Sequence, residues 1–594
     1  MRGDYFGSEY NKIDYRLIKR LLTFLKPYRN YIIIAIILTL LVSLLGPLRP
    51  YFTKIAIDNY IANLDKLGLY KIILIIFGVL LFQGISRFAL TYIMQWVGQS
   101  VLNDIRLKLY EHLQNLSFRF HDKNPIGRIV TRVTNDVESL NQLFSSGLIT
   151  MFADILLILW IVGFMFYINT NLTLISLIIL PLLLIVTSLF RKKVRVLFRD
   201  LRAEISKINS FLNEFISGIQ TVKIFNQEKK LENEFNKINK KIKDLNINTV
   251  FYYSLFYPSI EMISSIAVGL ILWYAASNII TGEITVGVLI AFLQYAQMFF
   301  RPIRDLSEKY TTLQNAMASS ERIFATLDTD DFIKQNDNIE YNELKNFIEF
   351  KDLSFSYDNS KWVLKNINFQ IKKGEVVAIV GPTGSGKTSI INLLLRFYEY
   401  QKGDILIDGI SIRNYNESSL RKKISIVQQE IFLFSKTIYD NITLGNKEIS
   451  FEQVRQAAVE LGFYDFILTL PEGFNTKMSE RGQTLSLGQR QLLSFCRAYV
   501  NNPDILILDE ATSNIDTHTE ILIEKALDKI LFGRTSIIIA HRLSTIKRAD
   551  KIIVLHKGDI REIGTHDQLI KNNDIYSKLY RLQYENLQNN SIIN

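Results

Sequence analysis

The chain has 594 residues, of which 48% are hydrophobic and 21% are charged. Residues 1–325 contain long uncharged stretches and residues 340–594 do not, which excludes both a single soluble domain and a wholly intramembrane protein. The net charge of +11 is compatible with nucleic-acid binding, but Lys and Arg in the cytoplasmic loops of a membrane protein explain it equally well. A single cysteine, Cys496, excludes an intrachain disulfide and a cysteine-based metal cage. The polar first residues predict no cleaved signal peptide.

Apolar stretches in the first half predict six membrane-spanning helices, because a span needs about 20 apolar residues. The longest stretch, residues 155–190, contains no Asp, Glu, Lys or Arg and is long enough for two helices joined near Asn169. We expect the spans near residues 30–53, 72–103, 139–168, 172–190, 247–278 and 284–305.

The charge of the loops predicts how these spans are oriented. Lys and Arg together number seven, six and fourteen in residues 1–29, 104–137 and 191–245. They number two, none and none in residues 58–71, 169–171 and 279–283. Since cytoplasmic loops carry the excess of Lys and Arg, both termini and the second half of the chain are predicted to be cytoplasmic, in a multi-pass protein of the cell membrane. The two long charged segments are expected to continue as helices beyond the membrane.

A glycine-rich loop in the second half predicts a nucleotide site. The segment GPTGSGKTS follows the apolar strand VVAIV and precedes a helical run, which is the context that G-x-x-x-x-G-K-[ST] requires. Its backbone N–H groups would surround phosphates, Lys387 would neutralise the β and γ oxygens, and Thr388 would offer its hydroxyl to Mg²⁺. The candidate ATP-binding residues here are Gly381, Pro382, Thr383, Gly384, Ser385, Gly386, Lys387, Thr388 and Ser389.

A second apolar strand, ILILDE, ends in two carboxylates. We expect Asp509 to hold Mg²⁺, directly or through water, and Glu510 to activate the attacking water as a general base. The cofactors implied are therefore ATP and Mg²⁺.

The segment TLSLGQRQ at 484–491 resembles the signature of ATP-binding cassette (ABC) proteins. The resemblance implies that Tyr357 stacks on adenine, that Gln429 contributes to catalysis by sensing Mg²⁺, water and the membrane domain, and that His541 contacts the γ-phosphate. It also implies that Asp516 crosses a dimer interface. The signature residues, expected to act on ATP bound to a partner chain, are Leu485, Ser486, Leu487, Gly488 and Gln489.

The first half resembles the membrane domain of ABC exporters, through residues 120–138 and 214–235 above all. In that family each of these loops carries a short coupling helix that rests on a nucleotide domain. The resemblance covers residues 10–580 and implies a half-transporter, with an all-α six-helix membrane domain followed by an α/β P-loop NTPase domain. The expected divisions are an N-terminal segment (1–29), the membrane domain (30–325), a linker (326–343) and the ATP-binding domain (344–594).

Leu487 departs from the family's usual signature, LSGGQ, in which a glycine occupies this position. In some members that are heterodimers, the chain that keeps its catalytic Glu has a signature altered here, facing the degenerate motifs of its partner. This chain combines Glu510 with Leu487, so a heterodimer with a second half-transporter is favoured over a homodimer. A tolerated substitution in a homodimer is the alternative.

Four charges interrupt the expected spans: Arg87, Asp154, Glu261 and Arg301. Intramembrane charges usually face a cavity and mark function, so these residues are candidates for a substrate cavity. The alternative is that they neutralise one another within the bundle.

The activity expected from these features is ATP-driven export of a lipophilic small molecule, lipid or peptide by alternating access. An ATP-gated channel or a regulatory subunit built from the same parts is the alternative. The spans argue against a nucleic-acid-acting ABC ATPase, and the fusion of both domains argues against an importer. A self-processing peptide exporter would need an extra N-terminal protease domain, which the short segment before the first span is not expected to supply.

Overall fold

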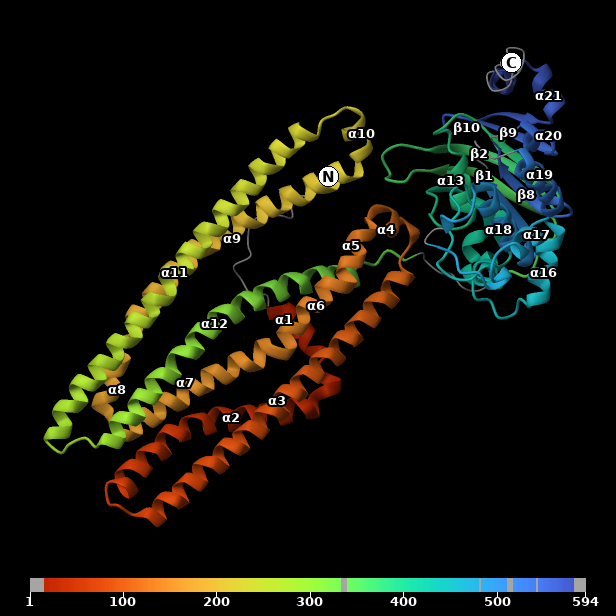
Figure 1. Ribbon diagram of the computed structural model, residues 1–594. Helices are drawn as coiled ribbons and strands as arrows, with labels where there is room; N and C mark the ends of the chain where they lie inside the picture. Colours follow the sequence, from red (N-terminus) through yellow and green to blue (C-terminus); the bar gives the residue numbers. More distant parts are fainter. Residues whose placement is uncertain (1–14, 333–338, 480–481, 510–516, 541–542, 582–594) are drawn as a thin grey trace. The chain divides into compact units, whose positions relative to one another are not determined.

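The computed structural model describes residues 15–332, 339–479, 482–509, 517–540 and 543–581. These residues form two compact units (Figure 1). One contains the described residues up to 114 together with 127–329, and the other contains 115–126 together with the described residues from 330 onward. The second unit thus includes a short segment that lies, in sequence, inside the membrane half. Each unit is described by itself.

The first unit is built from helices. The longer ones are α2 (Arg29–Ile55), α3 (Lys66–Asn115), α7 (Leu148–Ile168), α9 (Leu180–Ser217), α11 (Glu228–Ile280) and α12 (Val286–Leu327). The shorter ones are α1 (Tyr15–Thr23), α5 (Ile126–Thr131), α6 (Val137–Gln142), α8 (Thr170–Leu177) and α10 (Ile219–Ile224), with turns η1 (Lys26–Tyr28), η2 (Ala56–Ile61), η3 (Arg132–Asp136) and η4 (Leu143–Gly147) between them.

Five helical segments of this unit are long and apolar enough to cross a membrane: 26–61, 66–115, 126–168, 170–217 and 228–280. The helix α12 follows them with a shorter apolar stretch, Val286–Phe299. The protein is therefore a multi-pass membrane protein with a helical first half followed by an α/β domain, which confirms the predicted fold class.

The fourth of these segments is not one continuous helix. Helix α8 ends at Leu177 and α9 begins at Leu180, with Pro181 in the first turn of α9. Proline lacks a backbone N–H and is favoured in the first turn of a helix, where that N–H has no partner, so Pro181 suits the start of α9.

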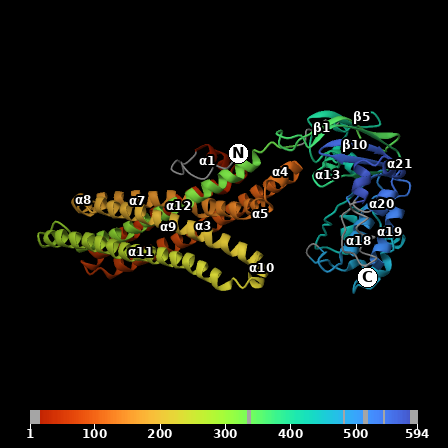
Figure 2. The same ribbon diagram turned by 90° about the horizontal axis from the view of Figure 1, so that it is seen from above.

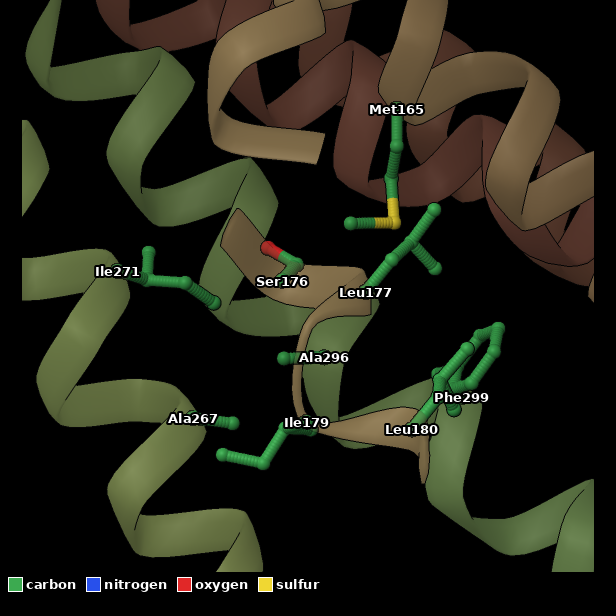
Figure 3. A pocket seen from close by; sticks show the side chains of 9 residues that line it. All are labelled: Met165, Ser176, Leu177, Ile179, Leu180, Ala267, Ile271, Ala296 and Phe299. Carbon is green, nitrogen blue, oxygen red and sulfur yellow. The ribbon is translucent and has the colours of Figure 1, made fainter. Parts of the chain in front are cut away.

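A small void lies beside this break (Figure 3). It measures about 20 Å³, which is room for about one water molecule. Side chains from α7, from the α8–α9 junction, from α11 and from α12 line it: Met165, Ser176, Leu177, Ile179, Leu180, Ala267, Ile271, Ala296 and Phe299. The void is far too small to hold a transported molecule.

Helices α9 and α11 run side by side along most of their length and are joined through α10, so they form a long hairpin (Figures 1 and 2). At its turn, four large apolar side chains are exposed: Ile216, Ile219, Ile224 and Phe225. Soluble surfaces rarely expose such a contiguous apolar group without a partner, so this tip has the character of an interaction surface.

Asp58 in η2 caps the start of α12. Its carboxylate accepts hydrogen bonds from the Thr285 hydroxyl at 2.6 Å and from the Gly287 backbone N–H at 2.9 Å. A carboxylate is favoured at a helix N-terminus because the unpaired N–H groups and the helix dipole are positive there. A Cβ at Gly287 would lie 2.5 Å from the Asp58 carboxylate, so only glycine leaves room for this contact.

The second unit contains two sheets. Strands β1 (Phe347–Phe355), β2 (Leu364–Lys372), β4 (Lys402–Ile407) and β5 (Ile410–Ser411) form an antiparallel sheet in the order β2-β1-β4-β5. Strands β3 (Val376–Val380), β6 (Ile424–Val427), β7 (Ile505–Asp509), β8 (Thr535–Ile539), β9 (Lys551–His556) and β10 (Asp559–Gly564) form the other, in the order β10-β9-β3-β8-β7-β6.

The helices of this unit are α4 (Phe118–Lys123), α13 (Lys387–Leu394), α14 (Glu417–Lys422), α15 (Ile438–Thr443), α16 (Phe451–Glu460), α17 (Tyr464–Leu468), α18 (Leu487–Val500), α19 (Thr517–Leu531), α20 (Leu543–Lys547) and α21 (His566–Lys571). Two short turns complete it, η5 (Ile412–Asn414) and η6 (Gly473–Asn475).

The inner strands of the six-stranded sheet are buried on both faces. Along β3, Val377 and Ile379 belong to one hydrophobic core, and Ala378 and Val380 belong to the other. Strands β7, β8 and β9 alternate between the two cores in the same way. Parallel strands covered on both faces are continuous apolar runs, which is why VVAIV and ILILD carry no polar alternation.

We expect the Gly287→Ala substitution to destabilise the first unit, because the added Cβ displaces the Asp58 carboxylate from the start of α12. The loss is about 1–3 kcal/mol, the cost of breaking hydrogen bonds to a charged group. Thermal unfolding of the purified protein in detergent measures it. Gly78→Ala in α3 is the matched control, because a Cβ there meets no atom within 4 Å. Equal melting temperatures for the two variants would contradict the assigned role of Asp58.

Candidate functional site

The sheet gathers the candidate ATP-site residues at one edge. Strands β3, β6, β7 and β8 are parallel, so their carboxyl ends lie at the same edge of the sheet. The glycine-rich loop follows β3, Gln429 follows β6, and Asp509 is the last residue of β7. In α/β sheets, ligands bind at the carboxyl ends of the strands, so this edge is the candidate site.

The loop after β3 has a backbone that side chains would obstruct. Gly386 has a φ of +106°, and a Cβ there would lie 2.6 Å from Leu364 Cδ2. A Cβ at Gly381 would lie 2.2 Å from the Leu555 carbonyl oxygen. Gly384, with a φ of +80°, has open space around it. The glycines therefore hold the loop tightly against β2 and β9 while its outer side stays accessible to a ligand.

Two polar groups inside the loop fit a bound polyphosphate. The Ser385 hydroxyl is buried and has no hydrogen-bond partner among the described residues. The Lys387 ammonium is folded back onto the loop, where it donates to the Gly381 and Pro382 carbonyl oxygens at 2.7 and 3.2 Å. Burial lowers the pKa of Lys387, and the nearby Asp509 carboxylate partly offsets this. A phosphate oxygen would satisfy the unpaired Ser385 hydroxyl, and the Lys387 ammonium could exchange the carbonyl oxygens for the stronger, charged phosphate acceptors.

The residues predicted to hold Mg²⁺ supply only some of the ligands that the ion needs. Thr388 is exposed in the first turn of α13, and Gln429 is exposed after β6. Among the described residues, no group of three or more His, Cys, Asp or Glu side chains could hold a metal ion. Mg²⁺ typically uses one or two protein ligands together with substrate phosphates and water, so Thr388 and Asp509 suit an ion that arrives with its nucleotide.

Tyr357, predicted to stack on adenine, lies beside this loop. Its hydroxyl is 2.9 Å from the hydroxyl of Ser389, which is buried in α13. Its ring makes edge-to-face contacts with Phe355 and Tyr398, with ring centroids 4.7 and 4.9 Å apart. Of the remaining loop residues, Pro382 and Thr383 are exposed.

The segment 115–126 lies in this unit, although the expected divisions place it in the membrane domain. The resemblance to ABC exporters implied that a short helix of this loop rests on a nucleotide domain, and α4 makes such contacts. The Phe118 ring of α4 stacks on Phe397, with centroids 5.1 Å apart, and the Asp122 carboxylate accepts a hydrogen bond from the Tyr398 hydroxyl at 2.9 Å. Since Tyr398 also contacts Tyr357, three contacts connect α4 with the helix that follows the phosphate loop. The resemblance of residues 120–138 to an exporter loop was the signal for this contact, but nothing local identifies Phe397 and Tyr398 as the residues that α4 meets.

The signature segment forms the start of α18. Ser486 is its N-cap, accepting a hydrogen bond from Gln489 N at 3.2 Å while the Gln489 side chain accepts one from Ser486 N at 2.9 Å. Leu485 and Gly488 are buried, and Leu487, the first residue of the helix, is half-buried. This reciprocal capping fixes the helix start although Leu487 replaces the glycine of the usual signature.

Three predicted site residues lie outside the described part of the chain. They are Glu510, Asp516 and His541. Their expected roles stay predictions.

Of the four charges that interrupt the expected spans, the structure describes the side chains of Arg87, Asp154 and Glu261. Asp154 pairs with Lys309, whose ammonium lies 2.5 Å from the carboxylate, and sequence reasoning had not considered Lys309. Arg87 and Glu261 are exposed in the single chain, and neither forms an ion pair with another described residue. The side chain of Arg301 lies outside the described part. Both alternatives for the four charges, a substrate cavity and mutual neutralisation, therefore stay predictions.

Each half of the chain matches a known protein family. Residues 32–303 match the model of the ABC transporter transmembrane region, and residues 364–513 match the ABC transporter model. An uncharacterized ABC transporter ATP-binding protein of Bacillus subtilis is 40% identical, with 95% of this chain and 94% of that protein aligned.

Two further relatives carry functional descriptions. A putative multidrug export ATP-binding/permease protein of Staphylococcus aureus is 39% identical over 96% of this chain and 100% of its own length. An ATP-dependent lipid A-core flippase of Syntrophus aciditrophicus is 35% identical over 96% of this chain and 95% of its own length.

The unpaired Ser385 hydroxyl yields a prediction. We expect Ser385→Ala to leave the stability of the nucleotide-free protein unchanged or slightly higher, because no hydrogen bond is lost. It should weaken ATP binding about fivefold, the value of one hydrogen bond of about 1 kcal/mol. Thermal unfolding with and without ATP measures both quantities. A fall in the melting temperature without ATP would show that the hydroxyl has another partner.

Proposed function

Because this chain belongs to the ABC transporter family and is an ATP-hydrolysing exporter, we propose that it moves lipophilic molecules across the cytoplasmic membrane by alternating access. The observation that supports this most directly is the presence, in one chain, of a multi-pass helical domain and a phosphate loop at the edge of a parallel sheet. The proposed divisions are the membrane domain at 30–325 and the ATP-binding domain at 344–594.

In the proposed mechanism the chemistry is positioning and charge stabilisation around the γ-phosphate. Lys387 turns from the loop carbonyls to the phosphates, and the backbone around Gly384 surrounds them. Thr388, Gln429 and Asp509 would hold Mg²⁺, which neutralises charge on the phosphate oxygens. Glu510 takes the proton of the attacking water, and His541 contacts the γ-phosphate.

We propose that the site is completed by a second half-transporter. Leu485–Gln489 act on the ATP bound to the partner, and Asp516 lies at the interface between the two ATP-binding domains. The exposed apolar tip of the α9–α11 hairpin supports such an assembly, because a nucleotide domain of the partner would cover Ile216, Ile219, Ile224 and Phe225. ATP binding favours the closed pair of domains, and this preference is what shifts the membrane helices.

The substrate class rests on the relatives and on the membrane charges. The relatives named for multidrug export and for lipid A-core flipping favour lipophilic or amphipathic substrates. Arg87 and Glu261 lie in apolar helices without an ion-pair partner in the described part of the chain. Such charges are costly in lipid, so we propose that they face the transport cavity of the assembled transporter.

The export function is tested in inside-out membrane vesicles with the fluorescent lipophilic dye Hoechst 33342. We expect ATP, but not ADP, to drive its accumulation against a gradient. Dye that equilibrates in the presence of ATP without accumulating would favour the alternative, an ATP-gated channel.

We predict that Glu510→Gln leaves ATP binding intact and lowers turnover about 100-fold, because the water loses its general base while the phosphate loop is unchanged. Binding is measured with a fluorescent ATP analogue and turnover by phosphate release. Turnover near the wild-type rate would remove Glu510 from the proposed mechanism.

Leu487 supports a heterodimer over a homodimer. A bulky side chain at the first position of α18 would crowd the partner's nucleotide where glycine would let the backbone approach. In a homodimer both sites would carry this handicap, whereas in a heterodimer it falls on a single site that need not hydrolyse ATP.

We therefore predict that the chain alone hydrolyses ATP weakly and that a partner with a glycine at this position raises the rate strongly. Leu487→Gly should change the paired enzyme little and raise the rate of the chain alone. Strong, dye-stimulated hydrolysis by the purified single chain would contradict the heterodimer and leave the export function standing.

A further inference from the structure

Two long helices end where the chain passes from the first unit to the second. Helix α3 ends at Asn115 and α12 ends at Leu327, and the second unit takes up the chain again at 115 and at 330. Inside the second unit, the Ser117 backbone N–H donates to the Asp331 carbonyl oxygen at 2.8 Å, so the two incoming segments lie side by side there.

Helix α1 joins the ends of these two helices within the first unit. Arg20 of α1 donates two hydrogen bonds to the Asp328 carboxylate, at 2.6 and 2.7 Å, so the pair is bidentate. Its guanidinium also lies 4.1 Å from the centre of the Phe324 ring in the last turn of α12. Arg20 therefore contacts two successive turns of the end of α12, through charge and through an aromatic face.

Phe24, which directly follows α1, extends the contact to α3. Its ring lies 6.4 Å from the Phe324 ring and 5.5 Å from the Lys108 ammonium of α3. Leu21, on the same helix, is 2% exposed, so α1 is packed into the first unit and not merely adsorbed on its surface.

The position of Asp328 is unfavourable for the helix by itself. It is the C-cap residue of α12, where the helix dipole is negative and an acidic side chain is disfavoured. Hydrogen bonds from Arg20 lower the pKa of Asp328, so the carboxylate is ionised at neutral pH and the pair persists. Exposed ion pairs usually contribute little, and a bidentate arginine that also stacks on a ring is the geometry in which they contribute more.

We propose that Arg20 and Asp328 are positioning residues for the coupling of ATP hydrolysis to transport. By holding the last turn of α12 to α1, and through Phe24 to α3, the pair makes the two helices that lead into the ATP-binding domain move together. The inference rests on the proposed export function. Without the pair, ATP binding and hydrolysis continue, but less of their free energy reaches the membrane helices.

Charge reversal tests the proposal in the full-length protein with its partner. We expect Arg20→Asp and Asp328→Arg each to lower dye transported per ATP hydrolysed about fivefold or more, the range of typical coupling free energies. The double reversal should restore the ratio of dye transported to ATP hydrolysed. Arg20→Lys should keep part of this ratio, because lysine has the charge but not the bidentate fork of arginine. Lys19→Asp is the matched control, an exposed lysine beside Arg20 on the same helix.

A second measurement does not depend on the choice of dye. Cys496 is buried, and burial raises the pKa of its thiol to about 12, so the natural cysteine does not compete for labels. Spin labels at Leu64→Cys, in the turn before α3, and at Ile280→Cys, the last residue of α11, are both at exposed positions and report a distance change when ATP and vanadate are added. We expect Arg20→Asp to reduce this change while nucleotide trapping stays within twofold of wild type.

The outcomes separate the two proposals. The absence of ATP-dependent dye accumulation by the wild-type protein would contradict the export function. The spin-label experiment would then still test the positioning role of Arg20 and Asp328. A ratio and a distance change in Arg20→Asp equal to those in Lys19→Asp would overturn the positioning role. If the charge-reversal variants are not produced in the membrane in folded form, Asp328→Asn, which keeps the side-chain volume, replaces them. Its transport ratio and distance change are compared with those of Lys19→Asp in the same way.

Discussion

The hydrogen-bonded pairing of β3 with β8 and β9 is the constraint on which the candidate site depends. It aligns the end of VVAIV with the ends of the neighbouring parallel strands, so that residues far apart in sequence meet at one edge. Because the strands are buried on both faces, a shift in register would move an entire set of side chains from one core to the other. The geometry of the phosphate loop is therefore set by two hydrophobic cores that contain none of the reacting groups.

The membrane unit depends on contacts of another kind. A few charged and polar groups connect its helices. Asp58 contacts the start of α12, Arg20 pairs with Asp328 at its end, and Asp154 pairs with Lys309 between the interiors of α7 and α12. In an apolar surrounding, helix association gains little from hydrophobic burial, so polar contacts and close packing decide which ends stay together. All three contacts involve α12, the helix that leads into the ATP-binding domain.

Much of this organisation was predictable from local signals. The glycine-rich loop, the strand ending at Asp509 and the long uncharged stretches are each defined within 10 to 40 residues, and the structure has the expected elements at all three. What could not be predicted are contacts between distant segments. Nothing near Asp154 in sequence indicates Lys309, and nothing near Arg20 indicates Asp328, because an ion pair leaves no pattern along the chain. The break before Leu180 had a signal in Pro181, but an apolar run of this length hides it.

The membership of α4 in the ATP-binding unit has a consequence for synthesis. Helix α4 ends at Lys123 and β1 begins at Phe347, so more than 200 residues, with most of the membrane helices, separate it from the rest of its unit. At about 5–20 residues per second, ribosomes need about 10–45 s to make that interval. During this time Phe118 and Asp122 have no partners, and afterwards the new domain exposes Phe397 and Tyr398 until α4 is in place. The ATP-binding unit is thus completed by a helix that was made long before the rest of it.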